Sequence, residues 1–221
     1  MNYEYRLSLF VFTRYFLKLL NGASYFYFNI IAKIIKYCDM HKDIEEILIK
    51  EEDINKRIKE LSAQISMDYK GKCVFFIGIL KGCFLFLSDL VKNVDINTNV
   101  DFMMVSSYVG MESTGVVRTL LDLKQSIEGK NVIIVEDIVD SGLTMNYLLK
   151  NLKTRNPKSI DVCTLLSKPS CRKIKVPIKY CGFEIPNKFV VGYGLDYNEL
   201  YRNLPYIGIL KEKLRGENEI K

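Results

Sequence analysis

The sequence predicts an α/β domain with a mainly parallel central sheet and helices on its faces. Short continuous apolar runs, such as Val74–Gly78 and Val132–Val135, have the pattern of strands buried on both faces. Segments with helical periodicity alternate with these runs, and such alternation is typical of parallel sheets. The length of 221 residues, with no Pro/Gly/Ser-rich linker in its body, favours one domain.

The first predicted helix follows the apolar stretch Ile44–Ile49 and ends before Gly71, with one apolar face at three- and four-residue spacing. The elements expected after it are a strand at Val74–Gly78, a turn at Ile79–Gly82, a helix at Cys83–Val91, strands at Val100–Ser106 and Val132–Val135, a helix through Met145–Lys153, and strands at Asp161–Ser167, Ile178–Phe183 and Lys188–Gly192. Ligands of parallel sheets bind at the carboxyl ends of the strands. The residues that directly follow each apolar run are therefore the candidates for function.

The composition restricts the kind of site the chain can carry. The chain has one histidine, His41, which lies far from every motif described below and leaves little room for histidine-based catalysis or metal binding. The six cysteines form no C-x-x-C pair and most lie in apolar runs, which indicates reduced thiols in a cytoplasmic protein. A net charge of +6 suits a small polyanionic substrate and is weak support for nucleic-acid binding.

Residues 1–39 are expected to be an N-terminal extension, and residues 40–221 the folded domain. The extension is apolar and aromatic, but Arg14 and Lys18 interrupt it before it reaches the ~18–20 apolar residues of a membrane helix. Three interpretations remain open: a membrane-surface segment, an added helix on the domain, or a segment outside the natural protein. We favour the third, because Met40 offers an internal start. No membrane association is expected for residues 40–221.

The chemistry is concentrated in Asn131–Leu149, which reads NVIIVEDIVDSGLTMNYLL. A buried run is followed by the acidic pair Glu136 and Asp137, and then by Asp140–Thr144 at the start of a helix. In this last segment Gly142 allows the backbone to approach a ligand closely, and two hydroxyl side chains add donors. The N–H groups and the positive dipole end of the following helix point to the same place. The segment therefore predicts a phosphate site.

Carboxylates beside a phosphate repel it unless a cation or hydroxyl groups lie between them. Ribose hydroxyls and Mg²⁺ satisfy that requirement, so we expect a sugar phosphate with Mg²⁺ rather than a bare phosphate. A solvated acidic turn with an Asp cap would explain one carboxylate. It does not explain a hydrophobic strand, paired acids and D-S-G-x-T in succession.

VIIVEDIVDSGLT resembles the phosphoribosyl pyrophosphate signature of the type I phosphoribosyltransferases. Four further segments resemble the hypoxanthine-guanine branch of that family, in the same order: the pyrophosphate loop IGILKGCFLFLSDLV, the mobile lid VSSYVGMESTG, the base-contact strand LLSKP and the C-terminal hood FVVGYGLDYNELYRNLPYIGIL. The lid departs from the family at Val116, where an acidic residue is common. The resemblance runs from about Met40 to about Lys211. It implies the type I phosphoribosyltransferase fold, a central mainly parallel sheet flanked by helices with a small C-terminal hood.

The resemblance implies an enzyme of purine salvage. Such an enzyme transfers the phosphoribosyl group of 5-phosphoribosyl 1-pyrophosphate to hypoxanthine or guanine, giving IMP or GMP and pyrophosphate. The family also implies Mg²⁺ as cofactor, a cytoplasmic location and a homodimer or tetramer. Two alternatives stay open: a regulatory protein of the same fold that binds nucleic acid, and an enzyme for xanthine or another 6-oxopurine. No nucleic-acid partner is expected, because the chain lacks a recognisable DNA-binding module and its body is only mildly basic.

The resemblance assigns each part of the substrate to a group of residues. The implied 5′-phosphate site is Asp140, Ser141, Gly142, Leu143 and Thr144. The implied ribose and Mg²⁺ ligands are Glu136 and Asp137, with Asp196 for a second Mg²⁺. The implied pyrophosphate contacts are Lys81, Gly82 and Arg202. The implied purine site is Lys168, Phe189, Val190 and Asp196. The lid contributes Ser106, Ser107 and Tyr108.

Individual roles follow from the same resemblance. Asp140 is the implied catalytic residue and exchanges a proton with N7 of the purine. Lys168 donates to the purine O6, and thereby selects 6-oxopurines over adenine. Phe189 stacks on the base and Val190 offers main-chain contacts to its edge. A cis peptide bond is expected before Lys81. Taken singly, each of these residues could instead be a surface charge or part of the core; their shared order favours the functional interpretation.

Overall fold

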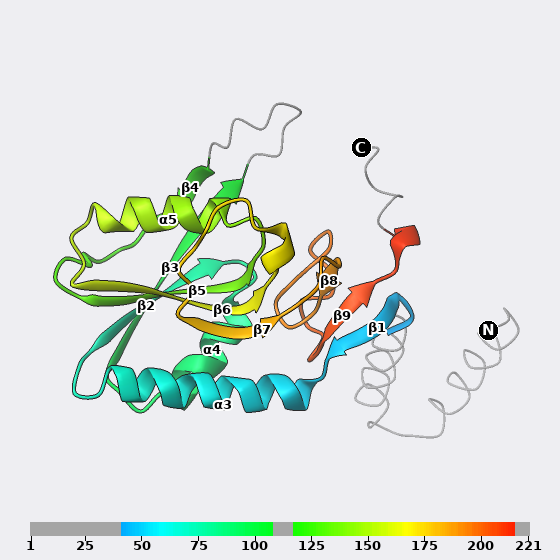
Figure 1. The fold of residues 1–221 in the computed structure, drawn as a ribbon, viewed down its shortest axis with the longest axis horizontal. Coiled ribbons are helices and arrows are strands. Elements are labelled where there is room, and N and C mark those ends of the chain that lie inside the picture. The colour runs from blue at the N-terminus through cyan, green and yellow to red at the C-terminus, as the bar shows by residue number, and fades with distance from the viewer. Residues whose placement is uncertain (1–40, 108–116, 215–221) are drawn as a thin grey trace, which may run out of the picture. The chain divides into compact units, whose positions relative to one another are not determined.

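The structure is a computed structural model that describes residues 41–107 and 117–214 (Figure 1). The chain divides into two compact units, Met1–Ile44 and Glu45–Lys221, and the fold below is that of the second. The expected extension, residues 1–39, lies outside the described residues and stays a prediction. The elements are β1 (Ile44–Ile49), α3 (Glu51–Asp68), β2 (Val74–Leu80), α4 (Phe84–Asn93), β3 (Thr98–Ser107), β4 (Val117–Leu121), β5 (Asn131–Val139), α5 (Leu143–Lys153), β6 (Ser159–Ser167), η1 (Pro169–Cys171), β7 (Tyr180–Glu184), β8 (Val190–Val191), β9 (Ile207–Leu210) and η2 (Glu212–Leu214).

Six strands form the central sheet in the order β4-β3-β2-β5-β6-β7 (Figure 1). All neighbouring strands pair in parallel except β4, which runs antiparallel to β3 at one edge. The predicted α/β architecture with a mainly parallel sheet is therefore confirmed. Among the residues that the structure describes, no helix combines the length and apolarity needed to cross a bilayer.

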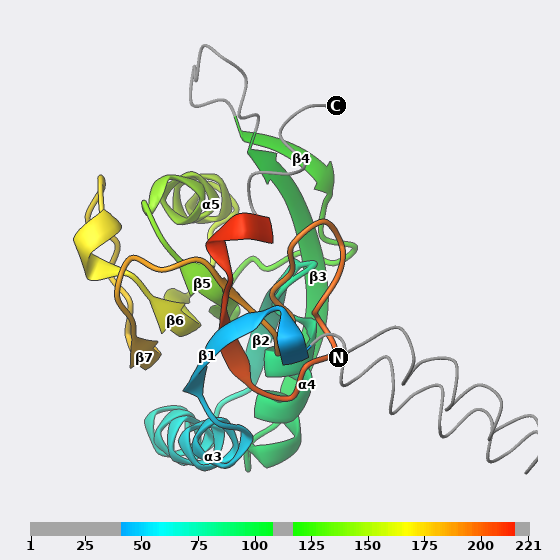
Figure 2. The same ribbon diagram turned by 90° about the vertical axis from the view of Figure 1, so that its right-hand side faces the viewer.

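Helices cover both faces of the sheet, with α5 on one side and α3 and α4 on the other (Figure 2). Side chains of a strand alternate between faces, so β2 serves two hydrophobic clusters. Phe75 belongs to the cluster that contains Met145 and Leu148 of α5. Phe76 belongs to the cluster that contains Ile58 of α3. Burial of a large apolar side chain contributes about 1.5–3 kcal/mol, which explains why the central strands are continuously apolar.

A second, three-stranded sheet in the order β1-β9-β8 includes the C-terminal hood that the sequence predicted (Figure 1). Within it, β8 and β9 pair antiparallel. The sequence analysis assigned no strand to β1, β4 or β9. In β4, Leu120 is 55% exposed, so this edge strand lacks the buried apolar pattern that marks the central strands. The strand β9 is only four residues long, and its pairing with β8 is a tertiary contact that the local sequence does not indicate.

One boundary differs from the prediction in a way that affects the site. The predicted strand ended at Val135, with the acidic pair after it, whereas β5 continues to Val139. Glu136 pairs with Thr164 of β6 in the register. The acidic pair therefore lies within a central strand, because strand pairing extends past the apolar run into polar sequence.

Candidate active site

Three of the predicted segments meet at the carboxyl edge of the central sheet. Lys81 and Gly82 follow β2, Asp140–Thr144 follows β5, and Lys168 follows β6. Because β2, β5 and β6 are parallel neighbours, their carboxyl ends lie at the same edge. Lys81 and Lys168, 87 positions apart in the sequence, thus follow strands that end at the same edge and are separated only by β5.

The turn between β5 and α5 has the geometry of an anion site. Gly142 adopts a left-handed backbone, with φ of +83°. A Cβ there would lie 2.6 Å from the carbonyl oxygen of Ile174, so a larger residue would meet both strain and a backbone clash. The helix begins at Leu143, and the N–H of Asn146 donates to the Gly142 oxygen at 2.9 Å. The N–H groups of the first helical turn have no intrahelical partner and can receive an anion.

A second loop, residues 172–176, fixes this turn through backbone hydrogen bonds. The N–H groups of Lys173 and Ile174 both donate to the Ser141 oxygen, at 2.9 and 3.2 Å. The Arg172 guanidinium donates through Nη2 to Ser167 Oγ at 2.8 Å, while its Nη1 is buried without a partner. The sequence analysis did not select Arg172, because its contacts depend on tertiary structure.

The acidic pair in β5 is electrostatically unfavourable as it stands. Glu136 Oε2 is buried and has no hydrogen-bond partner. Burial raises the pKa of Glu136 well above its ordinary value, and the neighbouring Asp137 carboxylate raises it further. Burial also raises the pKa of Asp137. Arg202 acts against this shift at Asp137, and a cation bound by the two adjacent carboxylates would stabilise them further.

The donor set fits Mg²⁺ in its substrate-bound form. In phosphate-transfer sites Mg²⁺ is commonly held by one or two carboxylates together with substrate oxygens and water. Glu136 and Asp137 offer that number of carboxylates, and Glu136 contributes an oxygen that nothing else uses. Within residues 41–107 and 117–214, no three acidic, histidine or cysteine side chains form a metal-binding cluster.

The pyrophosphate loop packs against the acidic pair and the hood without room for side chains. A Cβ on Gly82 would lie 1.6 Å from Asp137 Oδ2. A Cβ on Gly194, in the hood, would lie 2.1 Å from the Gly82 oxygen, and Gly194 has a φ of +99°. Two glycines therefore allow three segments to meet. The Leu80–Lys81 peptide bond is cis, as the family resemblance implied.

Ion pairs join the pyrophosphate loop to the hood. Lys81 Nζ lies 2.9 Å from Glu199 Oε1. Arg202 Nη2 lies 2.8 Å from Asp196 Oδ1 and 3.3 Å from Glu199 Oε2. Arg202 Nη1 donates to the Gly194 oxygen at 2.8 Å, and its Nε is buried without a partner. Glu199 was not among the predicted site residues, although it stands between two of them in the sequence.

The predicted purine side is built around a buried lysine. Lys168 is only 7% exposed, and its Nζ lies 3.5 Å from Asp140 Oδ2. The N–H of Lys168 donates to the Val139 oxygen at 3.0 Å, which ties the end of β6 to the end of β5. Phe189 is 37% exposed and contacts the Tyr197 ring edge-on at 5.5 Å and 88°. The amine thus lies beside the turn Asp140–Thr144, and the aromatic ring belongs to the hood.

The phosphoribosyl transferase domain family matches residues 45–198 of the chain. The chain belongs to the phosphoribosyltransferase family. A hypoxanthine-guanine phosphoribosyltransferase of Staphylococcus aureus is 52% identical over 176 residues, covering 79% of this chain and 98% of that protein. This places the chain in the hypoxanthine-guanine branch that the sequence analysis identified, and the family prediction is confirmed.

Solved structures of this phosphoribosyltransferase family agree with the fold. A hypoxanthine phosphoribosyltransferase from Staphylococcus aureus superimposes with a TM-score of 0.77 at 52% identity, covering 79% of this chain and 96% of that one. The Trypanosoma cruzi enzyme in complex with the product IMP has a TM-score of 0.74 at 43% identity, covering 78% and 97%. The predicted type I phosphoribosyltransferase fold is therefore confirmed.

The structure gives little information on the predicted roles of Val190 and of the lid residues in this phosphoribosyltransferase. Val190 is buried in β8, opposite Ile209 of β9. Ser106 and Ser107 end β3, where they pair with β4. Tyr108, the third predicted lid residue, lies outside the described residues. The roles of all these residues stay predictions.

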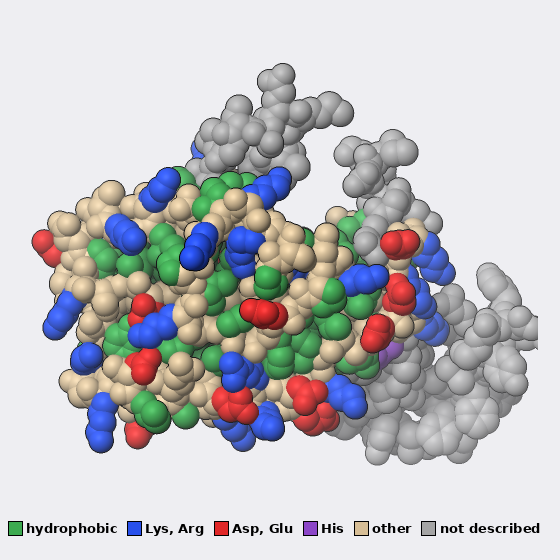
Figure 3. All heavy atoms as spheres, in the orientation of Figure 1, with side chains coloured by type: hydrophobic (Ala, Val, Ile, Leu, Met, Phe, Trp, Pro, Cys, Tyr) green, Lys and Arg blue, Asp and Glu red, His purple; other side chains and the backbone are tan. Residues whose placement is uncertain are grey.

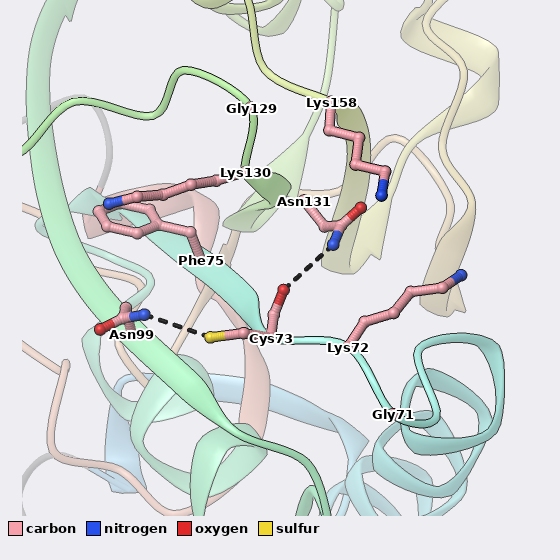
Figure 4. Close-up of a pocket in the computed structure, with 9 residues that line it drawn as sticks. All are labelled: Gly71, Lys72, Cys73, Phe75, Asn99, Gly129, Lys130, Asn131 and Lys158. Carbon is pink, nitrogen blue, oxygen red and sulfur yellow. Dashed lines mark hydrogen bonds between the residues drawn. The ribbon is translucent and has the colours of Figure 1, made fainter.

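A hollow of about 410 Å³ lies at the opposite, amino edge of the sheet (Figure 4). Three lysines line it, but Figure 4 shows their side chains pointing in different directions, and Lys130 Nζ lies 4.6 Å from the centre of the Phe75 ring. The amide of Asn131 donates to the Cys73 oxygen at 3.2 Å, and that of Asn99 to Cys73 Sγ at 3.3 Å. One N–H of each amide is thus used within the chain, and none of the predicted site residues lines this hollow, so the carboxyl edge is kept as the candidate active site.

Lysine and arginine side chains are spread over the face of the molecule shown in Figure 3, interleaved with acidic and apolar side chains. They form no continuous basic stripe on that face. Nothing on this face favours the nucleic-acid-binding alternative that the sequence left open.

Proposed function

We propose that this enzyme acts in purine salvage, transferring the phosphoribosyl group of 5-phosphoribosyl 1-pyrophosphate to hypoxanthine or guanine. The products are IMP or GMP and pyrophosphate. One observation carries the proposal: the phosphate-binding turn Asp140–Thr144 and the buried Lys168 converge at one sheet edge, with Lys168 Nζ 3.5 Å from Asp140 Oδ2. The identity to the Staphylococcus aureus enzyme and the likeness to the IMP-bound Trypanosoma cruzi enzyme support it.

The 5′-phosphate binds the turn between β5 and α5. The proposed ligands are the N–H groups of Ser141–Thr144 and the two hydroxyl side chains of that segment. The left-handed Gly142 lets the backbone wrap around the phosphate, and the helix dipole favours the negative charge. Glu136 and Asp137 in the adjoining strand bind the ribose hydroxyls.

Selection of the base rests on Lys168. Its ammonium group donates to the carbonyl O6 of hypoxanthine or guanine. The amino group at the same position of adenine cannot accept that bond well, and a buried ammonium without an acceptor is unfavourable. The Phe189 ring stacks on the purine, and the main chain at Val190 contacts its edge. Asp196 completes the hood side of this pocket.

The reaction breaks the bond from ribose C1 to pyrophosphate and forms the bond from C1 to the purine N9. Asp140 exchanges the proton at N7, beside the Lys168 ammonium that lies 3.5 Å from its Oδ2. Lys81, the main chain at Gly82, and Arg202 stabilise the negative charge that develops on the departing pyrophosphate. Mg²⁺, held by Glu136 and Asp137 and in a second position by Asp196, would neutralise further phosphate charge when bound.

We propose that Ser106, Ser107 and Tyr108 belong to a lid that excludes water during transfer. We further propose that the enzyme is a cytoplasmic homodimer or homotetramer, and that residues 40–221 suffice for activity. Light scattering coupled to gel filtration measures the oligomeric state. A comparison of chains that begin at Met1 and at Met40 tests the role of the extension.

The purified chain with Mg²⁺ and 5-phosphoribosyl 1-pyrophosphate tests the reaction directly. Nucleotide formation is followed with hypoxanthine, guanine, xanthine and adenine in parallel. We expect IMP and GMP to form and adenine to remain unreacted. Binding of 5-phosphoribosyl 1-pyrophosphate without turnover of any base would overturn the proposal and favour a regulatory protein.

A further inference from the structure

Glu199 is an acidic side chain that the proposed mechanism does not use, although it lies among the groups proposed to receive pyrophosphate. Its Oε1 lies 2.9 Å from Lys81 Nζ, and its Oε2 lies 3.3 Å from Arg202 Nη2. One carboxylate thus bridges two cations from different segments. Lys81 lies 118 positions before Glu199 in the sequence. A bridging carboxylate and a bridging pyrophosphate oxygen present similar negative charge to such a pair.

The local backbone places Glu199 in this position. Asn198 and Glu199 have φ values of +51° and +62°, in the left-handed region that residues other than glycine rarely adopt. The N–H of Glu199 donates to Asp196 Oδ2 at 2.9 Å, which closes the turn. An isolated antiparallel β-bridge between Tyr197 and Leu200 flanks the turn on both sides. The turn therefore holds the Glu199 side chain over the pyrophosphate loop in a backbone conformation that is strained for residues other than glycine.

The contact is exposed enough to be exchanged with a ligand. The side chains of Lys81 and Glu199 are 53% and 64% exposed, whereas that of Arg202 is 19% exposed. The two oxygens of the Glu199 carboxylate each face one of the two cations at ion-pair distance. Exposed ion pairs contribute little to stability, and a multiply charged anion can displace a single carboxylate from the same cations.

We propose that Glu199 is a displaceable counter-anion of the pyrophosphate site, which occupies Lys81 and Arg202 until pyrophosphate or the pyrophosphate group of the substrate replaces it. The inference rests on the proposed function of these two cations. It has a direct consequence for the reaction: Glu199 competes with the product and weakens its retention. A residue that only fastened the hood to the loop would have no such effect on pyrophosphate affinity.

Binding of inorganic pyrophosphate to the full chain, measured by titration calorimetry with Mg²⁺ present, tests the proposal. Glu199→Gln keeps the size and the oxygen acceptor but removes the charge. We expect it to tighten pyrophosphate binding roughly threefold to tenfold, the range that the loss of two exposed ion pairs allows. IMP has no pyrophosphate group, so its affinity should stay within about twofold. Glu128→Gln, at an exposed position beyond the amino edge of the sheet, should change neither affinity.

A double variant separates competition from a structural role. If Glu199 acts through Lys81, the gain from Glu199→Gln should shrink when Lys81→Gln is already present. Unchanged or weaker pyrophosphate binding by Glu199→Gln, or a gain that does not depend on Lys81, would overturn the inference. A wild-type chain that forms no nucleotide and binds no pyrophosphate would instead contradict the proposed function, so the two failures are distinguishable.

Discussion

Near the amino edge of the central sheet, polar side chains are paired with one another. The Tyr69 hydroxyl donates to Asp161 at 2.6 Å, and the Tyr180 hydroxyl donates to Asp68 at 2.7 Å. Lys179 Nζ lies 2.8 Å from Asp161 and 3.4 Å from Asp68, so one ammonium group serves both carboxylates. Each charge in this cluster has an opposite charge or a donor beside it.

The carboxyl edge of the same sheet is built differently. In the described part of the chain, three buried side-chain atoms lack a hydrogen-bond partner, on Glu136, Arg172 and Arg202, and all three residues belong to this edge or to the hood beside it. Buried polar atoms are normally paired, so we propose that these three groups bind the substrate. On this proposal, the side chains at the amino edge contribute to stability and those at the carboxyl edge to function.

The largest expected effect is on turnover at the carboxyl edge. Asp140 is 51% exposed, and an asparagine keeps an oxygen that can accept from the Lys168 ammonium, so Asp140→Asn should lower the melting temperature only slightly. Loss of a group that moves a proton in the transition state should lower kcat by about 10²–10⁴-fold. Steady-state kinetics and thermal unfolding measure the two quantities. A kcat for Asp140→Asn near the wild-type value would contradict the proposal that Asp140 exchanges the purine N7 proton.

Asp161→Asn is the matched change at the amino edge and should behave in the opposite way. It removes the charge that faces Lys179 and weakens the bond from Tyr69. We expect a loss of about 1–2 kcal/mol in the free energy of unfolding and a kcat close to wild type. Equal losses of activity in Asp140→Asn and Asp161→Asn would contradict the assignment of function to the carboxyl edge and of stability to the amino edge.

Substitution of Gly82 should affect both stability and activity. A Cβ at this position would lie 1.6 Å from Asp137 Oδ2, so Gly82→Ala must displace the acidic pair or the loop, at about 1–3 kcal/mol. Gly129→Ala is the control, because it has open space for a Cβ and only the left-handed φ of +67° to oppose it. Its expected loss is about 1 kcal/mol, with normal activity. The two variants behaving alike in an activity assay would contradict the close packing argued for the loop.

A smaller effect of opposite sign is expected at Glu136. Its buried, unpartnered oxygen and the adjacent Asp137 make the ionised side chain unfavourable without a cation. Glu136→Gln should therefore raise the free energy of unfolding by about 1 kcal/mol in chelator-treated protein, while lowering activity with Mg²⁺. Chemical denaturation with and without Mg²⁺ measures this. A destabilised variant in chelator would mean that the carboxylate is already compensated.

The smallest effect concerns pH at the amino edge. The hydrogen bond from Tyr180 lowers the pKa of Asp68, with Lys179 adding to the shift. A lowered pKa in the folded chain means that ionised Asp68 stabilises the protein above about pH 4, the range of an unfolded Asp. This stabilisation is lost as the pH falls through the folded value. Asp68 is 36% exposed, so the contribution, screened by solvent, is about 0.5–1 kcal/mol.

Denaturation curves of wild type and Asp68→Asn at several pH values check this prediction. The two should differ at neutral pH and converge in acid, with the same kcat. A difference that grows as the pH falls would reverse the sign derived from the Tyr180 contact.

Local patterns in the sequence were sufficient for the parts of the site that are contiguous. The turn from Asp140 to Thr144 needs only a buried strand, a glycine and a helix start, all of which are adjacent in the chain. The end of β5 was wrong by four residues, because pairing with β6 and not local apolarity decides where that strand ends. Glu199 and Arg172 were missed, since their partners are set by tertiary contacts that no local spacing encodes.

A crystal structure of the full chain with IMP, Mg²⁺ and pyrophosphate tests the central claim most directly. The account predicts the 5′-phosphate on the N–H groups of Ser141–Thr144, the purine against Phe189 with O6 in hydrogen-bonding reach of Lys168, and pyrophosphate on Lys81 and Arg202. Nucleotide bound instead in the lysine-lined hollow at the amino edge, or a purine whose O6 faces away from Lys168, would contradict it.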